Sequence, residues 1–160
     1  MADHEELKVP KDRIAVELGL RNGARRTGHL FLAENEAHAF RHESVTDIML
    51  DERTFLPVSM VDGDEWVFVN KSAIGYLAMG RLDHEDLRLF DQDVDVQVCL
   101  RDGSELSGSL LYSARTEQSR LIDFLNSDTP YVRLYGPDTI FIVDKHFIDS
   151  VAQLNNEGSE

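Results

Sequence analysis

Apolar positions alternate along much of this chain, which is the pattern of β-strands with one buried face. Residues 14–20 read IAVELGL and residues 94–100 read VDVQVCL, and in both segments every second residue is apolar. An Asn-Gly or Asp-Gly dipeptide follows each segment, and such dipeptides accept the positive φ of a tight hairpin turn. The turn glycines are Gly23 and Gly103. The pattern predicts a two-stranded hairpin at both places.

The hairpin is part of a longer repeat. Five residues recur 80 positions later in the chain: Leu20, Arg21, Gly23, Gly28 and Leu30. Further matches continue at offsets of 76 and 74, and the offset changes only in the polar stretches 33–44 and 59–65. Loops accept such length changes more readily than packed elements do, so we interpret the repeat as an internal duplication.

Each unit predicts about five short strands and one short helical insert. Gly28 and Gly108 lie inside the second strand of their units, where a glycine favours a bend or a bulge of the kind that closes small barrels. We therefore expect a mainly β protein of two tandem small barrels. The expected boundaries are a tail over 1–12, a barrel over 13–78, a linker with room for a short helix over 79–92, a barrel over 93–153 and a tail over 154–160.

One resemblance adds to this pattern. The strand, the (Asn/Asp)-Gly turn, the bent strand and the segment KHFIDSV at 145–151 resemble Sm-like barrels, which are related to SH3-like barrels. They are most similar to the bacterial branch of these proteins, the host-factor RNA chaperones. The first unit has Lys71-Ser72 and lacks the histidine, and the helical insert departs from the Sm-like pattern. With its insert, the unit resembles a family of uncharacterised bacterial domains.

The resemblance implies a binding role for Lys71, Lys145 and His146, because this segment lines a nucleotide pocket in the RNA chaperones. The alternative is that a lysine at the start of an edge strand keeps that edge soluble. Arg25 and Arg26 form an adjacent basic pair that could bind an acidic group.

Asp47 and Asp123 recur in the helical inserts of the two units. Their recurrence favours a shared structural role, such as satisfying backbone amides in the turn, over a catalytic pair. The sequence has no nucleophile motif and no phosphate loop, and it offers no set of three or four metal ligands. We expect no enzyme activity, no metal and no cofactor.

The net charge of the chain limits the classes of binding partner that we expect. The 160 residues carry a formal net charge of -14, which repels phosphate backbones and anionic lipid. We therefore expect no DNA or membrane partner, and RNA binding would have to work against this field. The single cysteine, Cys99, cannot form an internal disulfide, and the first residues lack the apolar core of a signal peptide, so we expect a cytoplasmic location.

These observations favour a non-enzymatic protein-protein interaction or adaptor module, with self-association by strand-edge pairing as one form of it. Pro57 cannot donate a ladder hydrogen bond, so we expect its strand to be a blunted edge, and Arg133 at the matching place to mark a more available one. The alternatives are an Sm-like RNA-binding protein and a small-ligand sensor with a groove between the barrels.

Overall fold

The computed structural model describes residues 12–32, 41–60, 65–81, 92–112 and 121–154. These residues are mainly β-structure, so the fold class expected from the alternating pattern is confirmed at that level. Most of the expected linker, residues 82–91, and most of both expected tails, residues 1–11 and 155–160, lie outside the described residues.

The first half of the chain, residues 12–80, and the second half, residues 92–153, have the same order of elements. The first half contains β1 (Asp12–Leu20), β2 (Arg25–Leu32), α2 (Arg41–Leu50), β3 (Phe55–Met60), β4 (Trp66–Asn70), the 3-10 turn η2 (Lys71–Ala73) and β5 (Ile74–Gly80). The second half contains β6 (Gln92–Leu100), β7 (Glu105–Tyr112), α3 (Leu121–Leu125), β8 (Tyr131–Tyr135), β9 (Thr139–Asp144), the 3-10 turn η4 (Lys145–Phe147) and β10 (Ile148–Gln153).

The hairpins form where the sequence predicts them. In β1 the alternating residues Ile14, Val16 and Leu18 are buried, and the strand pairs with β2 over eight residue pairs. Gly23 has a φ of 94° and Gly103 has a φ of 92°. Both turns therefore use the left-handed backbone conformation that glycine adopts without a steric cost.

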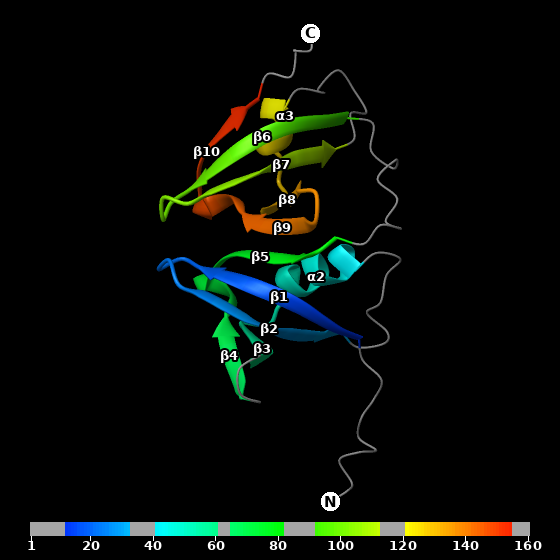
Figure 1. The fold of residues 1–160 in the computed structure, drawn as a ribbon, viewed down its shortest axis with the longest axis vertical. Coiled ribbons are helices and arrows are strands. Elements are labelled where there is room, and N and C mark those ends of the chain that lie inside the picture. The colour runs from blue at the N-terminus through cyan, green and yellow to red at the C-terminus, as the bar shows by residue number, and fades with distance from the viewer. Residues whose placement is uncertain (1–11, 33–40, 61–64, 82–91, 113–120, 155–160) are drawn as a thin grey trace, which may run out of the picture.

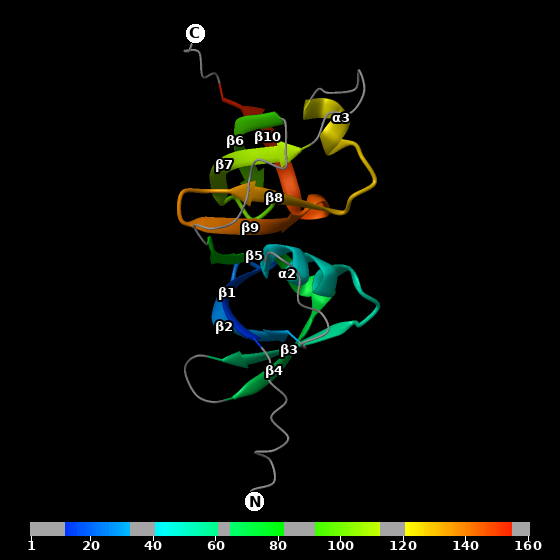
Figure 2. The ribbon, with the colours of Figure 1, turned by 90° about the vertical axis from the view of Figure 1, so that its right-hand side faces the viewer.

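The strands form one open antiparallel sheet in the order β10-β6-β7-β8-β9-β5-β1-β2-β3-β4. Strand β5 of the first half pairs with β9 of the second, and Figures 1 and 2 show the two side by side between the halves. The expectation of closed barrels is wrong for the part of the chain that the structure describes. The outer edge of β5 is taken by β9 and not by β4 of its own half, so neither half closes on itself.

Two clusters of buried apolar side chains form the core, and each contains residues from both halves. Ile140 and Ile142 of β9 lie in the cluster of the first half. Tyr76 and Ala78 of β5 lie in the cluster of the second half. Burial of one large apolar side chain contributes about 1.5–3 kcal/mol, so this exchange couples the two halves.

Pro57 is not on an edge strand, which corrects the expectation made from the sequence. Strand β3 lies between β2 and β4, and β8, which carries Arg133, lies between β7 and β9. The pairing of β2 with β3 covers Gly28 and His29 and stops before Pro57. The proline is tolerated because the ladder toward β2 has already ended there, and the two ends of the sheet are β4 and β10.

Candidate interaction site at the sheet edges

The two lysines singled out in the sequence lie at the C-terminal ends of the helices. Lys71 donates from Nζ to the carbonyl oxygen of Ile48 in α2 at 2.5 Å and to Oδ1 of Asp51 at 2.5 Å. Lys145 donates to the carbonyl oxygen of Ser127, just after α3, at 3.0 Å. A cation at this position satisfies carbonyl groups that the helix itself leaves unpaired. Both ammonium groups are therefore engaged in holding a helix against the strands.

These contacts change the ionisation of the groups involved. Partial burial alone would raise the pKa of Asp51, but hydrogen bonds from Arg53 and Lys71 outweigh it and hold this pKa well below its ordinary value. Burial lowers the pKa of Lys145, and the carboxylate of Asp128 opposes that shift. The cap of α2 is thus an ion pair, whereas the cap of α3 is a lysine on a neutral acceptor.

Replacing Lys71 with methionine should lower the free energy of unfolding by about 1–3 kcal/mol at pH 7, because the Ile48 carbonyl and the Asp51 carboxylate lose their donor. The check is chemical denaturation followed by circular dichroism. Lys145→Met is the matched comparison and should cost less, since no carboxylate loses a hydrogen bond there.

The effect of Lys71→Met should also depend on pH. A carboxyl whose pKa is lowered by folding stabilises the protein above its unfolded pKa, near 4, and this contribution falls as the pH drops toward the folded value. The difference between wild type and Lys71→Met should therefore shrink between about pH 4 and pH 2. An equal difference at both pH values would show that the ion pair contributes nothing.

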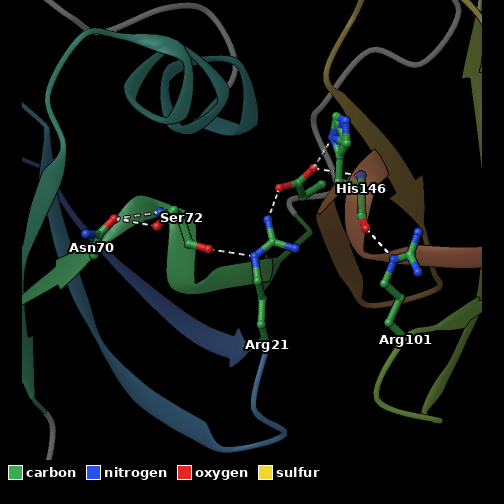
Figure 3. Close-up of polar contacts among 6 residues, drawn as sticks. Arg21, Asn70, Ser72, Arg101 and His146 are labelled. Atoms are coloured by element: carbon green, nitrogen blue, oxygen red, sulfur yellow. Dashed lines mark hydrogen bonds and ion pairs between the residues drawn. The ribbon is translucent and has the colours of Figure 1, made fainter.

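His146 is exposed on η4, and its ring Nδ1 lies 3.8 Å from Oδ1 of Asp144. Its backbone N–H donates to Asp144 at 2.8 Å, and its carbonyl oxygen accepts from Nε of Arg101 at 2.6 Å. Asp144 also accepts a hydrogen bond from Arg21 of the first half, which in turn donates to the carbonyl oxygen of Ser72. Figure 3 shows these contacts, which fix η2 and η4 at the junction of the halves.

The other residues singled out in the sequence lie on the first hairpin and on the two helices. Arg25 and Arg26 are exposed at the start of β2, opposite Gly19 and Leu18 of β1. Asp47 is exposed on α2, and Asp123 is half-buried on α3.

Strands β2, β3 and β4 carry an aromatic surface that the sequence analysis did not identify. Phe55, Trp66 and Phe68 are 52%, 51% and 66% exposed. The register places Trp66 opposite Ser59 and Phe68 opposite Pro57, and the Trp66 ring lies 5.2 Å from the ring of Phe31. We call Phe31, Phe55, Trp66 and Phe68 the aromatic patch. The signal for it was present in the segment WVFVN, whose apolar residues occupy both faces of a strand at the end of the sheet.

The other features of the described residues are weaker candidates for a binding or catalytic site. A shallow hollow of about 310 Å³ over β1, β5 and β9 is lined by Met79 and Phe141, with Glu17 and Thr139 as polar groups. An open hollow of this kind encloses little of a ligand's surface. Within the described residues no group of three or more His, Cys, Asp or Glu could hold a metal ion. None of the helices described is long and apolar enough to span a membrane.

The chain matches no protein-family model, no curated protein and no solved structure at a significant level.

Proposed function

We propose that this protein is a non-enzymatic protein-protein interaction module that binds a partner strand along the open edge of its sheet. The observation that carries the proposal is the aromatic patch, whose Trp66 and Phe68 are exposed on β4 at one end of the sheet. An edge strand offers unpaired N–H and C=O groups to a partner, and neighbouring apolar side chains give the contact its specificity.

The direction of the backbone amides on β4 supports this proposal. The N–H of Lys71, directly after β4, donates to the carbonyl oxygen of Thr54 on the β3 side. Because amide direction alternates along a strand, the N–H groups of Phe68 and Trp66 point away from β3. The two aromatic residues of β4 are therefore residues whose backbone N–H groups face a partner.

We also propose that the two halves are tandem copies of one Sm-like unit in a cytoplasmic protein. The sequence repeat and the shared order of elements support this origin. It does not by itself imply RNA binding, because fold does not determine function. Lys71 and Lys145 are both engaged by helix carbonyls, and the net charge of -14 opposes a phosphate backbone.

RNA remains the second candidate because exposed aromatic rings can stack on bases, and the guanidinium of Arg13 lies 6.0 Å from the ring centre of Phe31. In this alternative the aromatic patch, and not the Lys145 segment, would bind the nucleic acid.

Photocrosslinking from the edge tests the proposal. Phe68 is replaced by photoreactive benzoylphenylalanine, and the full chain is irradiated in an extract of its source cells. We expect ribonuclease-resistant protein adducts from position 68, because this side chain is 66% exposed on the edge strand. The matched control carries the same group at Ser107, an exposed residue on the interior strand β7.

Adducts that disappear after ribonuclease treatment would favour the RNA candidate. Equal yields from positions 68 and 107 would show that the β4 edge is not a specific binding site.

A further inference from the structure

The hollow over β1, β5 and β9 is lined by residues from both halves of the protein. It has a volume of about 310 Å³ and lies where β5 and β9 run side by side, next to β1 (Figure 1). The small residues Ala15, Ala78 and Gly80 leave the space, and Thr139 and Phe141 of β9 border it. The hollow is therefore a product of the junction between the halves.

Glu17 supplies the carboxylate of this hollow. It is half-buried, and it forms no ion pair or hydrogen bond with its side chain to any other residue that the structure describes. Burial raises the pKa of the Tyr76 phenol, and the negative charge of Glu17 adds to this shift, whereas Arg25 opposes it. Arg25 is itself exposed. A carboxylate that is partly removed from water is stabilised by a cation beside it.

The other lining groups fit a cation on an apolar stem. The register places Thr27 opposite Glu17, and Thr139 borders the hollow from β9, so two hydroxyl groups are available as further acceptors. The ring of Phe141 lines the hollow and is braced by the ring of Tyr76, with the two ring centres 6.0 Å apart. An aromatic ring attracts a cation and also packs against methylene groups.

The hollow lies on the same face of the sheet as the aromatic patch. Trp66 is opposite Ser59, and Ser59 is in turn opposite His29. His29 is opposite Ala15, which lines the hollow. Residues opposed in neighbouring strands point to the same face, and three strand spacings separate β4 from β1 by about 14 Å. A partner that contacts the aromatic patch therefore comes within reach of the hollow.

The charges on this face favour one placement of a basic partner. The guanidinium of Arg13 lies 6.0 Å from the ring centre of Phe31 and 3.4 Å from Nε2 of His29, so a cation already stands beside the aromatic patch. Glu17 places a negative charge in the hollow. A basic side chain is repelled at the first place and attracted at the second. The net charge of -14 also attracts a basic partner over longer distances.

The second half has the same order of elements without this site. The position of Glu17 is taken by Gln97, whose side-chain amide donates to Glu105 at 3.0 Å. The position of Ala15 is taken by the larger Asp95. Strand β10 ends the sheet of the described residues, so no further strand lies where β9 lies beside β5. The hollow thus distinguishes the first half from its counterpart.

From these observations we propose that the hollow binds a lysine or arginine side chain of the partner protein, with the carboxylate of Glu17 as its counter-ion and Phe141 against its methylene groups. The inference rests on the proposed function, because a shallow hollow holds a single side chain only when the rest of the partner is bound elsewhere. It names the chemistry of that partner as a basic segment that crosses from the aromatic patch to β1.

A titration followed by nuclear magnetic resonance tests the hollow on the full chain. The probes are n-butylammonium for lysine and n-propylguanidinium for arginine, with neutral n-butanol as the control. The amide signals of Val16, Ala78 and Phe141 should shift saturably with at least one cation, with a Kd in the millimolar range, and should not shift with butanol.

Glu17→Gln should weaken the binding of the cation at least about 10-fold, because it removes a charged acceptor. The fold should persist, since the second half carries glutamine at this position. Glu52→Gln changes the net charge equally at an exposed residue outside the hollow, so it is the matched control and should bind as wild type does. No saturable shift with either cation, or equal shifts in the Glu17→Gln protein, would overturn the inference.

Photocrosslinking from position 68 connects the hollow with the partner. Adding Glu17→Gln to the benzoylphenylalanine protein should lower the adduct yield about 10-fold when the partner is scarce, because the yield then follows the affinity. Glu52→Gln should leave the yield unchanged. An unchanged yield with Glu17→Gln would overturn the inference and leave the interaction module standing. Equal yields from positions 68 and 107 would overturn the proposed function and, with it, the assignment of the hollow to a partner's side chain.

Discussion

Replacing Leu110 with alanine is expected to destabilise the half of the protein that does not contain it. Leu110 lies on β7 and is fully buried in the core of the second half. Truncating a leucine in such a core costs about 2–5 kcal/mol. Because the halves exchange side chains across the β5–β9 junction, we expect the whole sheet to unfold in one transition, and the loss to be shared.

Tryptophan fluorescence can follow the unfolding of the first half in this experiment. Trp66 is the single tryptophan and lies in the first half, so its fluorescence reports on β4, while far-UV circular dichroism reports on all strands. Denaturation of Leu110→Ala should shift both signals to the same lower midpoint. Both signals should be recorded at the same protein concentration, because any association would change the midpoint.

Leu30→Ala, with its change in the core of the first half, is the matched control and should lower both midpoints in the same way. If Leu110→Ala lowered the midpoint seen by circular dichroism and left that of Trp66 unchanged, the halves would be independent domains.

The local structure of this chain could be predicted from its sequence because short-range rules decide it. Alternation of apolar residues placed Ile14, Val16 and Leu18 on the buried face of β1, and the turn glycines Gly23 and Gly103 have positive φ. Turn geometry and side-chain alternation depend on neighbours within a few residues. No information about distant strands is needed for them.

The pairing of the halves could not be predicted in the same way, because the residues of a strand do not identify the distant strand that will pair with it. A clue was nevertheless present in the comparison of IGYLAMG in β5 with IDSVAQ in β10. The first segment is apolar on both faces, whereas the second carries the polar residues Asp149, Ser150 and Gln153, which distinguishes an interior strand from the end of a sheet. Reading the two units as closed barrels concealed this difference.

The lysines of the candidate site were chosen from a motif, and their binding role stays a prediction. In the structure Lys71 donates to the carbonyl oxygen of Ile48 in α2, and Lys145 donates to that of Ser127 just after α3. Trp66 and Phe68 were not among the candidates, and a strand that is apolar on both faces is usually buried. Only the strand order shows that β4 ends the sheet, and it is this position that makes the two aromatic residues a surface.

Replacing Gly28 with alanine should cost about 3 kcal/mol, because the new methyl group meets atoms that cannot move away. A Cβ at this position would lie 2.6 Å from Cγ1 of Val58 and 2.7 Å from the carbonyl oxygen of Ser59. The glycine lets β2 cross close to β3, and an added methyl group would push the two strands apart. A Cβ added at Gly108 of the second half would lie 2.8 Å from the carbonyl oxygen of Tyr135, so Gly108→Ala should be similarly costly.

Two further glycines distinguish the cost of steric crowding from the cost of an unfavourable backbone conformation. A Cβ at Gly80 meets nothing within 4 Å, so Gly80→Ala should leave stability unchanged or raise it by about 0.5 kcal/mol. Gly23 also has open space, but its φ of 94° disfavours any side chain, and Gly23→Ala should cost about 1 kcal/mol. Thermal and urea denaturation of the four variants should rank Gly28 and Gly108 as the most sensitive. A Gly28→Ala protein as stable as wild type would mean that β3 can withdraw from β2, and the close crossing would then not be what bends the sheet of the first half.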